Sequence, residues 1–162
     1  MSEERVSKGE KRSELIRPSR PAPAIGSIRT RVRYCECDPM GVAHHAAYAP
    51  WLEIARTELL RDCGVTYADM EKAGVFLVIT RLDIRYKRPI FYDDLIEVRT
   101  RVTGGSRVKL EHEYEVHVVE DGGHGRSDRM PGLPVMTGST TLACVTRDGK
   151  IRELPEWLAP EA

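Results

Sequence analysis

Apolar and polar residues alternate along five segments of the chain, and this period of two predicts β-strands. The first segment is 28–37, and four more follow at 75–89, 94–102, 106–119 and 135–147. Segment 75–89 opens as a continuous branched and aromatic run, which is typical of a strand buried on both faces. The pair Gly104-Gly105 predicts a tight hairpin between the third and fourth of these segments.

A different period runs from residue 46 to residue 63. There the apolar positions recur at spacings of three and four, which predicts an amphipathic helix; they include Tyr48, Trp51, Leu52, Ala55, Leu59 and Leu60. Pro50 is compatible with a helix only in its first turn, so regular helix is expected from about Ala47. Gly64 is predicted to end it. A second, short helix is expected over residues 66–74.

This order of elements predicts an α+β fold in which one long helix packs on one face of an antiparallel sheet. The remaining face and edge of such a sheet need cover, so a dimer is expected. With 162 residues the chain is one domain. Residues 1–26, rich in charge, Pro and Ser, predict a flexible N-terminal tail, and 27–162 the single folded domain. Within it, the Gly- and Pro-rich residues 120–134 predict a long exposed hairpin loop.

Charge and cysteine content exclude several classes of function. The chain has 25 Lys and Arg against 25 Asp and Glu, so no overall field attracts nucleic acid or an acidic membrane. The N-terminus lacks the apolar core of a secretory signal, and no apolar run approaches membrane-spanning length. Four cysteines without a CxxC pair indicate a reduced, cytoplasmic protein.

The candidate chemistry lies in "CDPMGVAHHAAY", residues 37–48, where Asp38, Gly41 and His45 precede the long helix. A helix start offers unpaired N–H groups and partial positive charge, which stabilise a developing oxyanion, and Gly41 admits a ligand close to the backbone. A carboxylate there can serve as nucleophile or general base. The alternative is structural, because an Asp-Pro turn commonly uses the Asp side chain to bond its own backbone.

Three stretches resemble the hotdog-fold acyl-CoA thioesterases of the 4-hydroxybenzoyl-CoA thioesterase and YbgC-like group. They are "YCECDPMGVAHHAAYAPWLEIARTELL", "RYKRPIFYDDLIEVRTRV" and "TGSTTLACVTRDGKIRELPE", in the order that the family has. The resemblance implies a five-stranded antiparallel sheet wrapped around one long central helix. Where many members read Asp-Thr-Asp, this chain reads Glu36-Cys37-Asp38 and keeps the final carboxylate.

The resemblance also implies the site and the reaction. Asp38 matches the catalytic Asp, and His45, seven residues on, matches a catalytic His or Tyr; His44 is interpreted as a bystander. Substrate-binding positions implied are Gly41, Val42 and Tyr48, although packing is favoured for Tyr48. The basic pair Arg107 and Lys109 would meet the phosphates of coenzyme A, with Arg85, Lys87 and Arg88 as a second candidate group.

The implied protein is an acyl-CoA thioesterase without cofactor or metal, acting as a homodimer or homotetramer. The site would lie at a subunit interface, with Asp38 and His45 near the partner's long strand around 75–79. Two alternatives stay open: a hotdog-fold dehydratase or hydratase, and a non-catalytic acyl-CoA-binding protein. The charge set Glu53, Arg56 and Glu58 is interpreted as solvated or at an interface, and His112 and His117, on opposite faces of one strand, as a poor metal pair.

Overall fold

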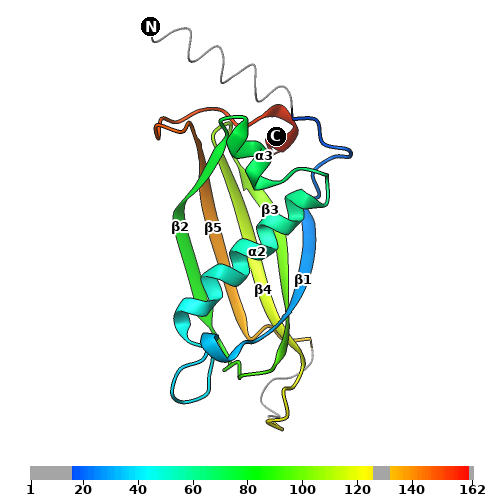
Figure 1. The fold of residues 1–162 in the computed structure, drawn as a ribbon, viewed down its shortest axis with the longest axis vertical. Coiled ribbons are helices and arrows are strands. Elements are labelled where there is room, and N and C mark those ends of the chain that lie inside the picture. Colours follow the sequence, from blue (N-terminus) through cyan, green and yellow to red (C-terminus); the bar gives the residue numbers. More distant parts are fainter. Residues whose placement is uncertain (1–15, 126–131, 161–162) are drawn as a thin grey trace, which may run out of the picture.

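The computed structural model describes residues 16–125 and 132–160, in which five strands form one antiparallel sheet. The strand order is β1-β3-β4-β5-β2, so β1 and β2 are its edges. The strands are β1 (Ile25–Arg31), β2 (Phe76–Tyr86), β3 (Leu95–Gly105), β4 (Lys109–Glu120) and β5 (Met136–Val145). Helix α2 (Tyr48–Arg61) lies diagonally across one face (Figure 1). The predicted α+β architecture is confirmed.

Helix α2 forms where the period of 3.6 predicted it. Its buried side chains include Trp51, Leu52, Ala55 and Leu59, which recur at spacings of three and four. A 3-10 turn, η2 (His45–Ala47), leads into it, and Pro50 lies in its first turn. Gly64, with φ of +83°, follows its last turn in the left-handed conformation that glycine tolerates.

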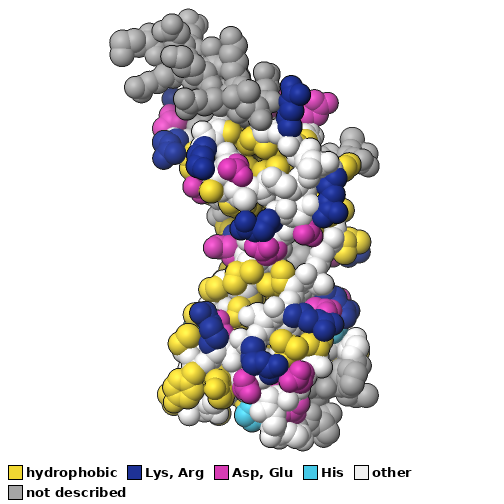
Figure 2. Space-filling model, turned by 45° about the vertical axis from the view of Figure 1, so that its right-hand side comes forward, with side chains coloured by type: hydrophobic (Ala, Val, Ile, Leu, Met, Phe, Trp, Pro, Cys, Tyr) yellow, Lys and Arg dark blue, Asp and Glu magenta, His cyan; other side chains and the backbone are white. Residues whose placement is uncertain are grey.

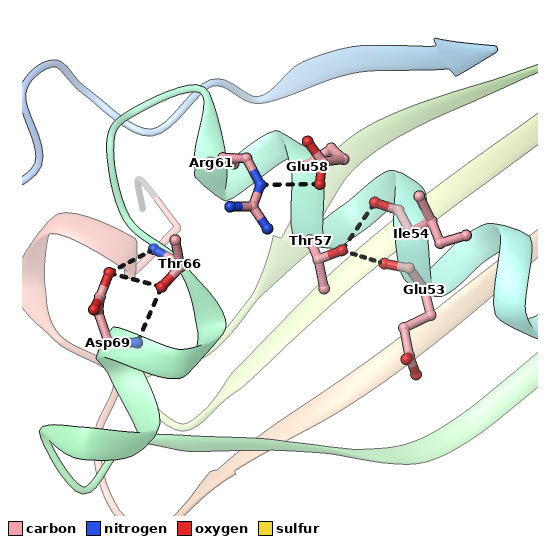
Figure 3. Close-up of polar contacts among 7 residues, drawn as sticks. All are labelled: Glu53, Ile54, Thr57, Glu58, Arg61, Thr66 and Asp69. Carbon is pink, nitrogen blue, oxygen red and sulfur yellow. Dashed lines mark hydrogen bonds and ion pairs between the residues drawn. The ribbon is translucent and has the colours of Figure 1, made fainter. Parts of the chain in front are cut away.

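Polar side chains stabilise the far end of α2 and the short helix α3 (Tyr67–Lys72), as Figure 3 shows. Asp69 N–H donates to the Thr66 hydroxyl at 3.1 Å, and the Asp69 carboxylate accepts from Thr66 N–H at 3.3 Å. This reciprocal N-terminal cap contributes about 1 kcal/mol to such a helix. On α2, Arg61 pairs with Glu58 at 3.0 Å.

The expectation that segment 75–89 begins buried on both faces is wrong, because it forms the edge strand β2, on which Val78 and Ile79 are 43% exposed. Two predictions of local element bounds are also wrong. The first strand runs from Ile25 to Arg31 rather than over 28–37, because residues 34–36 form the 3-10 turn η1 (Tyr34–Glu36), capped by the Glu36 side chain on Arg33 N–H. The second error concerns Gly104-Gly105, which lies within β3 beside a register shift, so that the turn falls at residues 106–109. A Cβ on Gly105 would lie 2.1 Å from the Lys109 carbonyl oxygen, so the position requires glycine.

Part of the segment expected as a tail is held against the domain. Ser19 N–H and its hydroxyl both donate to the Cys63 carbonyl, at 2.8 and 3.0 Å, and Arg20 donates to the Asp62 carbonyl at 2.5 Å. The other residues of that predicted tail, 1–15, lie outside the described residues, as do 126–131 of the predicted loop 120–134. β1 thus begins two residues before the predicted domain boundary.

The core beneath α2 consists of two apolar clusters. One gathers around Trp51 and Leu52, and the other around Cys63 and Met70. Buried polar side chains lie between the two clusters on three elements, namely Arg56 on α2, and His112 on β4 opposite Thr140 on β5. Such groups are costly to bury without partners, so an added charge in this layer should destabilise the fold.

Candidate functional site

Residues 36–44 form a small hairpin at the end of the sheet opposite the β3–β4 turn (Figure 1). His44 N–H donates to the Glu36 carbonyl at 2.7 Å, and Asp38 N–H donates to the Val42 carbonyl at 2.9 Å. Cys37 and Ala43 pair between these two bonds. The hairpin carries Asp38 outward and returns the chain directly to His45 at the start of η2.

The tip of the hairpin is a tight turn made by Asp38, Pro39, Met40 and Gly41. Gly41 N–H donates to the Asp38 carbonyl at 2.9 Å, and one carboxylate oxygen of Asp38 accepts from Met40 N–H at 2.8 Å. Gly41 has φ of +78° and open space where a Cβ would stand. The side-chain contact is the Asx-type bond that the structural alternative predicted. It occupies one acceptor position of a half-buried carboxylate that has several.

The hairpin is fixed on its outer side by the segment that leads into β3. Val42 pairs with Phe91, and Ala43 N–H donates to the Ile90 carbonyl at 2.7 Å. The fully buried Asp94 holds this segment, because its carboxylate accepts from Phe91 N–H at 2.7 Å and from Gly122 N–H at 2.9 Å. Asp38 is therefore part of a braced loop.

On its inner side the hairpin is bound to α2 through Glu36. The Glu36 carboxylate accepts from the indole N–H of Trp51 at 3.0 Å and from Arg33 N–H at 2.8 Å. Burial acts to raise the pKa of Glu36, but the hydrogen bonds from Arg33 and Trp51 outweigh it and hold the pKa below its ordinary value. Sequence reasoning treated Glu36 only as a neighbour of Asp38.

His45 is exposed, and the structure ties its backbone to the edge strand β2. Tyr86, the last residue of β2, donates its hydroxyl to the His45 carbonyl at 3.2 Å. The rings of His44 and His45 lie 4.0 Å apart. Tyr48 is buried between Trp51 and Tyr86, with ring centroids at 5.0 and 4.9 Å, and its burial and the nearby Tyr86 raise its pKa to about 12. Within one chain Tyr48 therefore packs the core beside the site.

The structure does not bring Arg107 and Lys109 near Asp38 in the same chain. Both lie at the β3–β4 turn, beyond the far end of β3 from the hairpin, and eleven strand residues span roughly 35 Å. Arg107 forms an ion pair with Glu153. The second basic group is closer, because Lys87 and Arg88 directly follow Tyr86, whose hydroxyl bonds His45.

One prediction about charges on α2 is wrong. Arg56, like Glu53 and Glu58, was expected to lie in solvent or at a subunit interface. Its side chain is instead buried within one chain, with 5% of its surface exposed. It lies four residues from Leu52 and from Leu60, both buried, so its position follows the apolar stripe. Its guanidinium still contacts the exposed Glu53 carboxylate at 3.3 Å.

Figure 2 shows hydrophobic side chains and charges of both signs mixed over this face, with hydrophobic groups at the hairpin end, in the middle and toward the opposite end. Met40, at the hairpin tip, is 83% exposed, and the exposed rings of Tyr34 and Tyr92 meet edge to face at 5.7 Å. A separate hollow of about 510 Å³ lies over β2–β5 and β3–β4, lined by charged residues such as Arg85, Arg99 and Glu113, and includes neither Asp38 nor His45. The surface around the hairpin tip is thus more apolar than the lining of that hollow.

Comparison with known proteins agrees with this geometry. Residues 32–161 match the thioesterase-like superfamily, so the chain belongs to that family. A solved DHNA-CoA thioesterase from Staphylococcus aureus superposes with a TM-score of 0.71 at 34% identity, covering 83% of each chain. The neighbours in structure are hotdog-fold thioesterases, and the predicted hotdog fold is confirmed.

Relatives in sequence point the same way. A Bacillus subtilis protein with the provisional name acyl-CoA thioesterase YneP is 38% identical over 57% of this chain and 67% of its own length. The acyl-CoA thioester hydrolase YbgC of Escherichia coli O6:H1 is 34% identical over 45% of this chain and 54% of its own. In the part of the chain that the structure describes, no helix is long and apolar enough to span a membrane.

Proposed function

We propose that this protein hydrolyses an acyl-CoA thioester to free coenzyme A and a carboxylic acid, with the Asp38 carboxylate as nucleophile or general base. The observation that carries the proposal is the braced hairpin, which holds Asp38 in a fixed turn seven residues before His45 at the start of η2, in a chain of the thioesterase-like family. The names of the relatives from Staphylococcus aureus and Bacillus subtilis support acyl-CoA as the substrate class.

Two balanced routes use the same carboxylate. As a nucleophile, Asp38 attacks the thioester carbon, the C–S bond breaks, and coenzyme A leaves as a thiolate; water then hydrolyses the mixed anhydride and restores the carboxylate. As a general base, Asp38 takes a proton from water as that water attacks the carbon, and the proton passes to the departing thiolate. His45 is proposed to donate a hydrogen bond to the thioester oxygen or to orient water.

The working unit is proposed to be a homodimer, alone or as half of a tetramer, joined along β2. This edge strand exposes three large apolar side chains, Val78, Ile79 and Leu82, at 42–43%, beside Arg81 and Arg85. The other edge, β1, exposes one, Ile25, beside Arg29 and Arg31. Arginines protect an edge from pairing, and an apolar edge invites it. A two-fold axis would set the two β2 strands antiparallel, so that each hairpin lies near the opposite end of its partner.

This arrangement would bring Arg107 and Lys109 of one subunit to the Asp38 of the other, where they meet the phosphates of coenzyme A. Gly41 and Val42 are proposed to line the thioester. A cytoplasmic location remains a prediction from the cysteine pattern of the sequence.

A thiol-release assay with short, long and aromatic acyl-CoA substrates tests the proposal. Asp38→Asn keeps the shape of the side chain and the Met40 contact but removes the base, and should lower kcat by about 10²-fold or more. Asp148→Asn changes an exposed carboxylate that accepts from the Thr146 hydroxyl at 2.6 Å on a surface turn; it is the control and should retain activity. Hydration of an enoyl-CoA would instead identify a hydratase, and binding without turnover a sensor; either result, or full activity in Asp38→Asn, refutes the proposal.

A further inference from the structure

Glu36 closes the base of the hairpin on which both candidate catalytic residues depend. Its carbonyl accepts the His44 N–H at 2.7 Å, the last main-chain bond before the chain enters η2. Asp38 lies two residues inside this base, and His45 directly follows it. A shift of Glu36 therefore moves both candidates together.

The Glu36 side chain connects this base to the core. One carboxylate oxygen accepts from the Trp51 indole at 3.0 Å and from the Arg33 guanidinium at 2.8 Å, and the other accepts from Arg33 N–H at 2.8 Å. The side chain is only 9% exposed, and Trp51 is 1% exposed in the middle of the first apolar cluster. A charged acceptor makes such bonds stronger than neutral ones.

We infer that Glu36 is a positioning residue, which fixes the Asp38 carboxylate relative to α2 through its bond with Trp51. This inference rests on the proposed function. Its physical reason is the sensitivity of catalysis to geometry, since a displacement of about 1 Å in a reacting group lowers the rate by roughly 10²-fold. Among the described residues, the other hydrogen bonds that the hairpin makes beyond its neighbours in the chain run to residues 90–92 at the start of β3, so Glu36 supplies its hydrogen bond to α2. Ala43 and Cys37 add apolar packing in the cluster of Trp51.

Two conservative variants and their combination test the inference. Trp51→Phe keeps the ring and removes only the N–H donor, while Glu36→Gln removes the charge that strengthens the bond. Each should lower kcat about tenfold with KM changed less than twofold. The double variant should lose less than the product of the two single effects, because both changes act on the same Trp51–Glu36 bond. Unfolding transitions measured on each variant show that the fold is retained.

The chain offers a matched control for each change. Trp157→Phe removes an indole N–H that has no hydrogen-bond partner among the described residues, and Glu58→Gln removes a carboxylate that pairs with Arg61 on the surface of α2. Both controls should keep wild-type kcat.

The inference is overturned if Trp51→Phe and Glu36→Gln keep wild-type kcat, or if only their KM rises. The proposed function survives this result as long as Asp38→Asn is inactive. Multiplicative losses in the double variant also overturn it, since the two residues would then act separately. If Glu36→Gln does not fold, Trp51→Phe decides alone. Full activity in Asp38→Asn is a different outcome, which removes the proposed function itself.

Discussion

Arg56 of α2 and His112 of β4 lie close together in the buried layer between the two apolar clusters, and the charge of the arginine acts on the imidazole. Burial first, and then Arg56, lower the pKa of His112 from 6.5 to about 4. Tyr114 stacks on His112 at 6.0 Å, and Tyr67 and Glu53 also face the guanidinium. A proton on His112 would therefore place a second cation in this layer.

Stability should fall as the pH is lowered from about 6.5 to 4. In this interval the unfolded chain binds a proton at His112 and the folded chain does not, so the free energy of unfolding rises with pH and levels off above 6.5. Over the full interval the free energy of unfolding should fall by about 3 kcal/mol. Urea unfolding at a series of pH values should show this loss in the wild type and a flatter profile in His112→Gln. His124→Gln, in an exposed segment, should keep the wild-type profile.

The bond from Tyr86 to the His45 carbonyl predicts a modest kinetic effect. Tyr86→Phe removes the 3.2 Å hydrogen bond but keeps the edge-to-face contact with Tyr48. A single hydrogen bond of this kind is worth about 1 kcal/mol, so kcat should fall roughly fivefold if the bond orients His45 for catalysis. Tyr34→Phe, on a ring that is 81% exposed, is the control. Unchanged kcat in Tyr86→Phe would show that this bond does not orient His45 for catalysis.

The elements whose pattern has a clear period were predictable from the sequence. Alternation identified the strands, and the spacing of Trp51, Leu52, Ala55 and Leu59 identified α2, because burial on one face imposes each period. Residues 32–37 were misread since a side-chain bond, from Glu36 to Arg33 N–H, outweighed an alternating pattern. Local hydrogen bonds of this kind leave no periodic signal.

The site was predictable only in part, for a different reason. The sequence placed Asp38 and His45 together because they are near in the chain, and the hairpin joins them. The sequence also assigned Arg107 to the same site, but it gives no distance between Arg107 and Asp38. The structure shows that the length of β3 separates them. The burial of Arg56 had a signal in its spacing from Leu52 and Leu60, but the charge of the residue argued against using it.

The separation of Arg107 from Asp38 predicts that the two act on one substrate only across subunits. Asp38→Asn should be inactive, and the double variant Arg107→Ala/Lys109→Ala should bind acyl-CoA weakly. Co-expressed with different tags, they form mixed dimers in which one site carries both defects and the other carries neither. About a quarter of wild-type activity should return at statistical mixing, since half of the dimers are mixed and half of their sites are intact.

A co-expression of Asp38→Asn with Asp38→Ala is the control and should restore nothing. If the first mixture is as inactive as this control, Arg107 and Lys109 do not serve a site on the other subunit. The nearer Lys87 and Arg88 would then be the cations to substitute next.

The exposed apolar side chains of β2 predict that a single charge on this edge separates the subunits. Ile79→Lys puts an ammonium where the partner's strand would pack, and a two-fold axis makes each substitution count twice. Each substituted side chain should cost about 1.5–3 kcal/mol of binding free energy, so the two together raise the dimer Kd by roughly 10² to 10⁴-fold.

Ile151→Lys is the control, because this residue is 72% exposed and lies outside the sheet edge, and it should leave the dimer intact. Sedimentation velocity measures the state of assembly. If the two subunits share the site as proposed, activity should fall in the concentration range in which the dimer dissociates. A wild-type protein that sediments as a fully active monomer would contradict the shared site and leave the β2 edge without a partner.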